Sequence, residues 1–572
     1  MKKNSLVSDY ILEYLLKKKI KHVFILQGGA IAFMIDAFSR RKDIKYIDVA
    51  HEQAAAMMAD GYSRVGPNLG VTMSTSGPGA TNLITGICCS WFDSVPVLHI
   101  TGQVNTFEQR GAQLGTKKAR QVGFQETNII DIVSSITKYA VKLNDSKKIK
   151  YHFDKAFHIS QNDRQGPVLI DIPVNFQNLK ISSIKSKIYA ENFQNKINLI
   201  NFNNKINKII RLITLAKKPI IILGSGVRLS KSVNKFNLLV KILKIPVIST
   251  WSGIDSIDSK NKYYFGTLGV YGTKYSNIIV QKSDLILSIG SRLDTRISGG
   301  RPDTFAKNAK KIIVDIDKNE ISKRRGITPD VSFACDAGFF MEELIKKMKK
   351  YKSEKISWNN DCKLIKKNNP IVSSEYYKQK KYVNPYVFFD ILSDLTNKKD
   401  VLIGDTGAHL TWLMQSFRQK LGQRIFSAFG HSPMGYAFPA AIGASLALNN
   451  KRVISINGDG SLQINIQELQ TLQTLNIPIK IFVFNNQGYG IIKQFQKQYI
   501  NSRFEGTIKK DSSPSFERIA NAYKIKFFKI DSQKNIKTIT NKALKFKGPC
   551  LCEVMINPDQ QIVPKLKYGD SL

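Results

Sequence analysis

Two short polar segments near the C-terminus have residue types that bind a metal ion and a diphosphate. Gly458-Asp459-Gly460-Ser461 follows one apolar run, and Asn485-Asn486 follows another. The residues 462–475 between them have the apolar spacing of a helix, so the pattern predicts a strand, a turn, a helix and a parallel strand. In such a right-handed crossover, both loops lie in one crevice at the edge of the sheet.

The oxygen atoms of these loops are of the kind that Mg²⁺ prefers. Asp459 offers a carboxylate and Asn486 an amide oxygen, and they are 486 − 459 = 27 residues apart. Mg²⁺ takes one or two such protein ligands and completes its coordination with phosphates and water. The glycines beside Asp459 let the backbone approach a phosphate closely. Taken singly, each segment is also typical of an ordinary turn or loop.

A glutamate at the end of a predicted strand is the candidate acid. Residues 44–50 have strand character and lead into His51-Glu52-Gln53, and the small residues 54–61 then predict a tightly packed helix. This places Glu52 at a strand end and at the start of a helix. A purely structural alternative is a negative charge that the helix dipole favours at this position.

The chain contains an internal repeat. Gly166-Pro167 before an apolar run is echoed by Gly548-Pro549, and 549 − 167 = 382. Pro96 is echoed by Pro478 at the same offset, since 478 − 96 = 382, and Gly77-Pro78-Gly79 matches the Gly-Asp-Gly loop at 458 − 77 = 381. A register held over more than a hundred residues predicts two domains of one architecture.

The predicted fold is α/β, with three doubly wound domains whose sheets are mainly parallel. We expect the domains at residues 1–178, 200–350 and 382–560, the first and third being related by duplication. The central segment has predicted strands at 219–223, 245–249, 284–289 and 311–316. Gly224-Ser225-Gly226 after its first strand is a candidate nucleotide loop or an ordinary strand-to-helix turn.

Composition indicates a large cytoplasmic enzyme rather than a nucleic-acid or membrane protein. The 86 Lys and Arg against 44 Asp and Glu give a net charge of +42. The lysines are scattered and form no basic stripe, so we expect a Lys-rich surface, with a basic nucleic-acid-binding protein as the distant alternative. The six cysteines have no metal-site spacing, and no signal peptide or membrane span is recognisable.

Several segments together resemble the acetolactate synthase branch of thiamine-diphosphate-dependent enzymes. They are Gln27-Gly28-Gly29-Ala30, His51-Glu52-Gln53, 75–82, Phe124-Gln125-Glu126, Met434-Gly435-Tyr436 and Gly458-Asp459-Gly460. The resemblance covers nearly the whole chain and implies pyrimidine-binding, central and diphosphate-binding domains in that order. It also implies a homodimer or homotetramer in which Glu52 of one subunit faces Asp459 of the other, and it leaves room for a regulatory subunit.

The resemblance implies a role for each matched residue. Glu52 activates the cofactor through a hydrogen bond to its pyrimidine nitrogen, with Gln125 and Gly28 on the substrate side. The cofactor-binding set is Glu52, Gly407, Ala408, His409, Met434, Gly458, Asp459, Gly460, Ser461 and Asn486. The Mg²⁺ ligands are Asp459, Asn486 and the carbonyl oxygen of Gly488. Ordinary core packing is the alternative for Met434, and a buried amide satisfied by the backbone is the alternative for Gln125.

Departures from the family pattern lie where the acceptor substrate binds. Ile491, Phe495 and Val270 stand where other residues shape the family's acceptor side. We expect decarboxylation of a 2-keto acid, pyruvate, and carboligation of the two-carbon unit to a keto acceptor. Alternatives are a related carboligase acting on a keto-sugar nucleotide and a plain 2-keto-acid decarboxylase. Residues 290–296 resemble a flavin-contacting loop, which makes FAD a further candidate cofactor.

Overall fold

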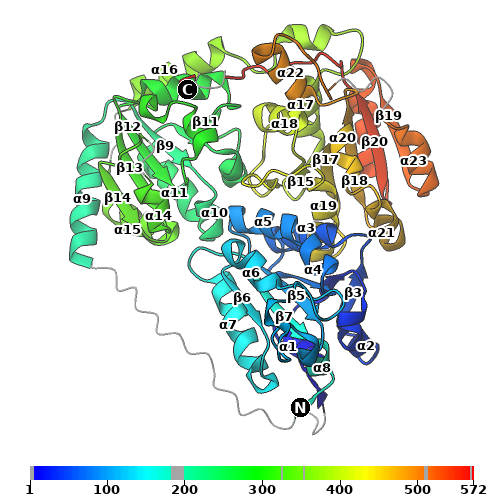
Figure 1. The fold of residues 1–572 in the computed structure, drawn as a ribbon. Helices are drawn as coiled ribbons and strands as arrows, with labels where there is room; N and C mark the ends of the chain where they lie inside the picture. Colours follow the sequence, from blue (N-terminus) through cyan, green and yellow to red (C-terminus); the bar gives the residue numbers. More distant parts are fainter. Residues whose placement is uncertain (1–4, 182–198, 324–325, 352–354, 508–512, 567–569) are drawn as a thin grey trace.

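Three α/β domains, each built on a six-stranded parallel sheet, make up the chain (Figure 1). The computed structural model describes residues 5–181, 199–323, 326–351, 355–507, 513–566 and 570–572. Continuous apolar runs form the inner strands because helices cover both faces of each sheet, which leaves both sets of their side chains buried. Outer strands such as those at 45–48 and 526–530 are partly exposed. The predicted fold class is therefore confirmed.

The first domain has the strand order β3-β2-β4-β5-β7-β6. Its strands are β2 His22–Ile25, β3 Lys45–Asp48, β4 Gly70–Ser74, β5 Val97–Gln103, β6 Tyr139–Lys142 and β7 Val168–Pro173. Its helices are α1 Val7–Lys17, α2 Ala32–Ser39, α3 Glu52–Val65, α4 Pro78–Asn82, α5 Ile84–Asp93, α6 Ile129–Val133, α7 Ile149–Gln161 and α8 Val174–Gln177. A two-stranded antiparallel ribbon, β1 Ser5–Leu6 with β8 Lys180–Ile181, closes the domain.

The third domain repeats this topology with the order β16-β15-β17-β18-β20-β19. Its strands are β15 Val401–Gly404, β16 Arg424–Phe426, β17 Val453–Gly458, β18 Ile479–Asn485, β19 Lys526–Ile530 and β20 Cys550–Met555. Its helices are α17 Pro385–Leu395, α18 Ala408–Ser416, α19 Ala437–Ala447, α20 Asp459–Gln463, α21 Glu468–Leu475, α22 Gly490–Tyr499, α23 Phe516–Ala522 and α24 Ile536–Lys545. The identical strand order supports the duplication that the sequence repeat predicts.

The central domain has a different order, β11-β10-β9-β12-β13-β14, in which the first strand lies next to the fourth. Its strands are β9 Pro219–Leu223, β10 Val247–Ser249, β11 Tyr264–Thr267, β12 Leu285–Ile289, β13 Lys310–Asp315 and β14 Val331–Ala334. Its helices are α9 Leu199–Leu215, α10 Gly226–Leu229, α11 Val233–Leu243, α12 Lys274–Lys282, α13 Thr295–Ser298, α14 Lys318–Ser322, α15 Ala337–Met348 and α16 Ile356–Asn368. This is the order of dinucleotide-binding sheets, which bind ligands where the order reverses, between β9 and β12.

The first and third domains contact each other through equivalent helices, α3 and α19. A methyl group on Gly61 would lie 2.2 Å from the carbonyl oxygen of Ala440, and one on Gly443 would lie 1.8 Å from that of Met58. These contacts are reciprocal, because 440 − 58 and 443 − 61 both equal 382. The two copies therefore pack about an approximate twofold axis that only glycines at these positions allow.

The predicted helix over 462–475 is wrong in one respect, because the structure divides it into α20 and α21. Asn465 lies at the break, where its side-chain amide donates to the carbonyl oxygen of Gly435 (2.8 Å) and its own carbonyl oxygen accepts from the backbone N–H of Glu468 (3.1 Å). The apolar spacing continues through the break, so the pattern alone could not reveal it. Within the part of the chain described above, no helix is long and apolar enough to cross a membrane.

Candidate cofactor site

The acidic part of the site is built around Glu52, the first residue of α3. Its side chain is buried, with 4% of the residue exposed, and Oε2 accepts a hydrogen bond from Nδ2 of Asn82 at 2.9 Å. A methyl group on Gly79 would lie 3.2 Å from Oε1, so the loop after β4 lies directly over the carboxylate. Because the strand end β3 and the loop after β4 meet here, Glu52 lies at the carboxyl edge of the first sheet.

Gly28 and Gln125 lie on either side of the same loop. A methyl group on Gly28 would be 2.5 Å from Cβ of Thr75, so glycine is required there by the close approach of the ends of β2 and β4. Gln125 has φ = 63° and packs against Gly77, on which a methyl group would lie 2.9 Å from its Cβ. The side chain of Gln125 is half-buried and has no hydrogen bond to the residues that the structure describes. A glutamine with a purely structural role would be buried, with its amide hydrogen-bonded to the backbone. The amide of Gln125 has no such hydrogen bond to the described backbone.

The candidate metal site brings together the two loops at the ends of β17 and β18. Asp459 accepts hydrogen bonds from the backbone N–H groups of Gly460 (2.8 Å) and Gly488 (3.0 Å). Burial raises the pKa of Asp459 to about 6. A methyl group on Gly490 would lie 2.4 Å from Nδ2 of Asn486, which fixes the path of the second loop. The parallel crossover that the sequence predicts is therefore present.

Asp459 is the carboxylate of this site. No group of three or more His, Cys, Asp or Glu side chains that could hold a metal ion occurs among the described residues. A site with one carboxylate, one amide oxygen and one backbone carbonyl fits Mg²⁺, which completes its coordination with phosphate oxygens and water. It does not resemble the closed nitrogen and sulfur sites of structural zinc.

His409 supplies a polar atom that fits a diphosphate. Its Nε2 is buried and has no hydrogen-bond partner among the described residues. Burial lowers the pKa of His409 to about 3, so the imidazole is neutral. Methyl groups on Gly407 and Gly458 would lie 2.5 and 2.9 Å from its Cε1, so glycines on both loops make room for the ring. An unpaired buried polar atom is costly, and a phosphate oxygen would satisfy Nε2 in the tautomer that carries the proton there.

Asp405 is a site residue that the sequence reasoning missed. Its carboxylate, at the end of β15, accepts from the backbone N–H groups of Gly435 (2.9 Å) and Ala437 (3.0 Å), and burial raises its pKa to about 7. It thereby holds the turn that carries Met434, which is half-buried and precedes Gly435 at φ = 86°. The signal was an aspartate at a strand end before Thr406-Gly407, the same pattern as Asp459.

The acidic and metal parts lie in different domains and are linked through Asn465. The side chain of Gln53 donates to Oδ1 of Asn465 at 3.5 Å, and Asn465 donates to the carbonyl oxygen of Gly435 at 2.8 Å. Between described residues, no hydrogen bond or ion pair joins Glu52 directly to Asp459 or His409. The acidic part belongs to the first domain and the metal part to the third.

Glu468 fixes the backbone that leads to Glu52. This fully buried residue begins α21 in the third domain, and its carboxylate accepts from the backbone N–H of Ala50 (3.0 Å) and the hydroxyl of Thr471 (2.8 Å). Burial raises the pKa of Glu468 to about 7, and the hydrogen bonds from Thr471 and Ala50 offset part of this rise.

Replacing Glu468 with glutamine should therefore change how stability depends on pH. The pKa of Glu468 is higher in the folded wild type than in the unfolded chain, so folding favours the protonated side chain. The contribution of Glu468 to the free energy of unfolding is therefore fully present below pH ~4.5 and is lost as the pH rises through ~7. Glutamine does not titrate, so the free energy of unfolding of the variant, relative to that of the wild type, should rise by up to about 3 kcal/mol between these limits. Thermal unfolding midpoints of both proteins, measured at matched scan rates from pH 5 to 8, test this. Parallel curves would contradict the assignment.

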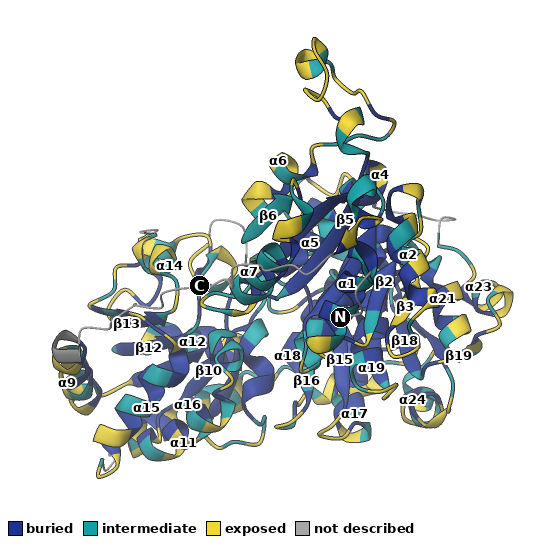
Figure 2. Ribbon diagram, turned by 90° about the horizontal axis from the view of Figure 1, so that it is seen from below, coloured by how far each residue is buried: buried dark blue, intermediate teal, exposed yellow. Residues whose placement is uncertain are grey.

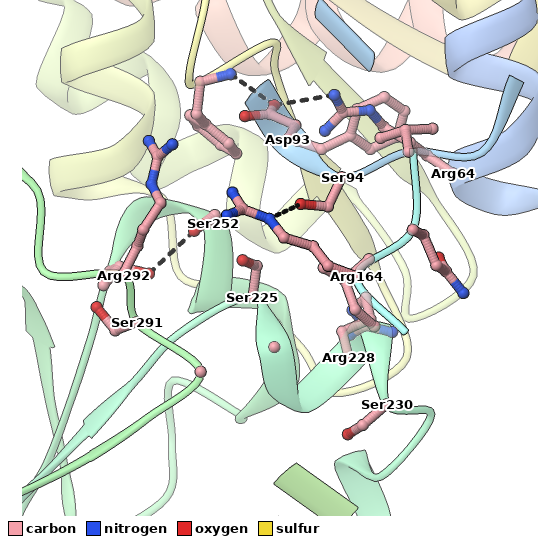
Figure 3. Close-up of a pocket in the computed structure, with 18 of the residues that line it drawn as sticks. Arg64, Asp93, Ser94, Arg164, Ser225, Arg228, Ser230, Ser252, Ser291 and Arg292 are labelled. Carbon is pink, nitrogen blue, oxygen red and sulfur yellow. Dashed lines mark hydrogen bonds and ion pairs between the residues drawn. The ribbon is translucent and has the colours of Figure 1, made fainter. Parts of the chain in front are cut away.

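A cavity of about 390 Å³ lies where the three domains meet. Its lining includes Ser225 and Gly226 after β9, Ser291 after β12, and Arg164 from the first domain. Figure 3 shows Arg164 among serines of the central domain, with its Nε donating to Ser94 at 3.0 Å. The cavity opens at the carboxyl ends of β9 and β12, which is where a sheet of this strand order binds ligands.

Glycine at position 224 has a structural reason of its own. A methyl group on Gly224 would lie 2.0 Å from the carbonyl oxygen of Gly290, because the turns after β9 and β12 touch. The close packing of these turns accounts for the glycines without a ligand, although it also shapes the wall of the cavity.

Comparisons with known proteins agree with this geometry. Three family models match successive parts of the chain: the N-terminal TPP-binding domain of thiamine pyrophosphate enzymes at 6–132, their central domain at 206–344 and their C-terminal TPP-binding domain at 405–554. The acetolactate synthase large subunit of Cyanidium caldarium is 33% identical over 100% of this chain and 97% of its own length. The large subunit of Pyropia yezoensis is 32% identical over 98% and 93%. The chloroplastic acetolactate synthase of Arabidopsis thaliana is 30% identical over 98% and 83%.

These matches extend over all three domains, and the matched ranges include Glu52 and Asp459. The chain therefore belongs to the acetolactate synthase family of thiamine-diphosphate-dependent enzymes.

Proposed function

We propose that this enzyme decarboxylates pyruvate and joins the resulting two-carbon unit to a keto acceptor. We also propose that its cofactor site binds Mg²⁺ together with thiamine diphosphate. The observation that carries the proposal is the meeting of Asp459 with the Gly488 loop beside the unpaired Nε2 of His409. The relatives named above are acetolactate synthases, which supports the reaction class. Thiamine diphosphate, when bound, would supply a nucleophilic carbon that adds to the keto group and a cationic ring that delocalises the electron pair released on decarboxylation.

The residues of this chain divide the work between binding and proton transfer. Asp459, Asn486 and the carbonyl oxygen of Gly488 would hold Mg²⁺ against the diphosphate, and the neutral imidazole of His409, in the tautomer protonated at Nε2, would donate to a phosphate oxygen. Glu52 holds a proton at the pyrimidine nitrogen, where burial and the hydrogen bond from Asn82 orient its carboxyl group. Asp405 fixes the Met434 turn, on which the cofactor bends.

The remaining residues of the proposed site surround these groups. They are Gly407, Ala408, Gly458, Gly460 and Ser461 on the diphosphate side, and Gly28 and Gln125 on the substrate side. The hydroxyl of Ser461 accepts from the backbone N–H of Gly458 at 2.8 Å, which stabilises the diphosphate loop. The proposed domain limits remain 1–178, 200–350 and 382–560, for the pyrimidine-binding, central and diphosphate-binding domains.

We propose that the complete site forms between two copies of the chain, in at least a homodimer. The resemblance to acetolactate synthases, which implies that Glu52 of one subunit faces Asp459 of the other, supports this arrangement. The segment between β5 and α6 extends from the body of the first domain (Figure 2) and exposes Phe107 (59%), Leu114 (fully) and Phe124 (85%). We propose that the partner subunit covers these exposed apolar side chains.

Mixed dimers test this arrangement. Chains carrying Glu52→Gln and Asp459→Asn should each be inactive alone. A purified heterodimer of the two contains one wild-type site and one doubly substituted site, so about half of the wild-type activity should return if sites form between chains. Two differently tagged chains, co-expressed and purified in succession, allow the measurement. Activity no higher than that of either parent would place the site within one chain.

FAD is the proposed occupant of the cavity between the domains. The strand order of the central sheet and the position of the cavity at the ends of β9 and β12 support a dinucleotide there. The resemblance of residues 290–296 to a flavin-contacting loop supports FAD in particular. Titration of the purified protein with FAD, followed by flavin fluorescence, tests the proposal, and Gly226→Leu should weaken binding.

Product analysis tests the reaction. The loaded enzyme is supplied with pyruvate alone and with 2-ketobutyrate or a keto-sugar nucleotide, and the products are identified by mass spectrometry. Acetolactate from pyruvate alone supports the synthase. A product from the keto-sugar nucleotide supports the alternative carboligase, because Ile491, Phe495 and Val270 replace acceptor-side residues. Release of acetaldehyde with every acceptor would instead identify a plain decarboxylase.

The proposed location is the cytoplasm. All six cysteines are free thiols, as expected in a reducing compartment, and five of them are buried.

We also propose that the protein binds a 2-keto acid rather than nucleic acid. Steeply salt-dependent binding to random DNA would favour the alternative of a basic nucleic-acid-binding protein.

A further inference from the structure

Each copy of the duplicated fold contains a buried pair of an acid and an amide at the same place. Gln103 ends β5, and its Nε2 donates to the carboxylate of Asp171 on β7 at 3.0 Å. Asn485 ends β18, and its Nδ2 donates to the carboxylate of Glu553 on β20 at 2.7 Å. The positions are equivalent, since 485 − 103 and 553 − 171 both equal 382. All four residues are buried.

The two pairs have the same total reach although no residue is shared between them. Asp171 is one methylene shorter than Glu553, and Gln103 is one methylene longer than Asn485. The strand register is also the same, with Thr101 opposite Asp171 and Val483 opposite Glu553. Because neighbouring strands lie a fixed ~4.8 Å apart, a shorter acid needs a longer amide to keep the contact. The compensating change indicates that the contact itself has been retained.

In both copies the amide oxygen holds the loop that follows the strand. Oε1 of Gln103 accepts from the backbone N–H of Val104 at 3.0 Å, and Oδ1 of Asn485 accepts from that of Gln487 at 3.0 Å. The second loop is the proposed Mg²⁺ loop. Gln103 also donates to the carbonyl oxygen of Thr127 at 2.8 Å, where the segment that carries Gln125 returns to the sheet.

Strand pairing alone does not require these side chains. The backbone register of β18 with β20 is continuous from Lys480 opposite Cys550 to Asn485 opposite Met555. A buried carboxylate also pays a desolvation penalty that apolar residues would avoid, so such a group is weak evidence for stability. Its retention at the base of a functional loop in both copies points to positioning.

We propose that Glu553 is a positioning residue that holds the Mg²⁺ loop through the amide of Asn485, and that Asp171 holds the loop of Gln125 in the same way through Gln103. Glu553 touches neither metal nor substrate in this arrangement. It fixes the amide, the amide fixes the backbone of Gln487, and that backbone places the ligands on either side, Asn486 and Gly488. The inference rests on the proposed function for the identity of this loop.

Exchanging the lengths of the two side chains tests the proposal. Glu553→Asp shortens the acid and Asn485→Gln lengthens the amide, so each alone disturbs the contact. The double variant builds in the third domain the pair that the first domain already contains. Each single variant should weaken Mg²⁺ affinity by about 10-fold, the lower end of the loss caused by removing a residue that holds a metal ligand, because Glu553 acts one contact further from the metal. The double variant should restore affinity to within about threefold of wild type. Affinity is measured by Mg²⁺ titration of tryptophan fluorescence with thiamine diphosphate present, so turnover is not needed.

Controls separate this inference from the function on which it rests. The matched exchange in the first domain, Asp171→Glu with Gln103→Asn, should leave Mg²⁺ affinity unchanged. Glu553→Gln keeps the reach and an acceptor oxygen, so it should retain affinity where Glu553→Asp loses it. If Glu553→Asp fails to fold, Asn485→Gln takes its place as the disrupting variant. Unchanged Mg²⁺ affinity in Glu553→Asp would overturn the positioning role of Glu553. So would a double variant whose loss of affinity equals the product of the two single losses. If Asp459→Asn also binds Mg²⁺ normally, the metal site itself is misassigned, and Glu553 then has no metal loop to position.

Discussion

Replacing Asp459 with asparagine should abolish Mg²⁺-dependent binding of thiamine diphosphate. The substitution keeps the size of the side chain and an oxygen that accepts from the Gly488 N–H, but it removes the carboxylate that neutralises the metal. Since loss of a residue that hydrogen-bonds to a metal ligand costs about 10–100-fold in metal affinity, loss of this direct ligand should cost more. Cofactor titrations with and without Mg²⁺ measure the effect.

Asp400→Asn is a matched control in the same domain. Asp400 is also buried, but it precedes β15 at the amino edge of the sheet and pairs with Arg452 at 2.6 Å. This variant should lose stability while keeping the Mg²⁺ dependence of cofactor binding. Wild-type affinity in the Asp459 variant would show that the metal binds elsewhere.

Replacing Glu52 with glutamine should leave the cofactor bound and slow exchange of its C2 proton by about 10²–10⁴-fold, which is the usual contribution of one general acid or base. Glutamine is isosteric and can still accept from Asn82, so the loop after β4 should stay in place. An amide does not supply the proton that the pyrimidine nitrogen needs. Exchange in deuterated buffer, quenched with acid and followed by NMR, measures the rate.

The surface substitution Glu13→Gln provides the control for this experiment, because Glu13 pairs with Lys17 on α1 away from the site. Its exchange rate should equal that of wild type. A wild-type rate in the Glu52 variant would reduce Glu52 to a favourable charge at the start of α3.

The sequence contained enough local information for the fold and for most of the candidate site. Strands that are buried on both faces are continuous apolar runs, and turn residues end them, so the central strands near 219–223 and 284–289 were predicted within a residue of β9 and β12. The edge strands β11 and β14 were not predicted, because their sequences, Tyr-Phe-Gly-Thr and Val-Ser-Phe-Ala, lack the continuous apolar run of the inner strands. The break at Asn465 was missed because its cause is a hydrogen bond to a residue 30 positions away.

The sequence by itself determined which loops carry chemistry, because strand ends, glycines and acidic residues lie together along the chain at Glu52 and Asp459. It also determined the duplication, through a repeat offset of 382 residues. Only the tertiary structure decided that Asp405 holds the Met434 turn, that Glu468 holds the backbone before Glu52 across 418 residues, and that Glu553 is paired with Asn485. Such contacts follow from the order of strands and the packing of domains, which no local spacing of residue types encodes.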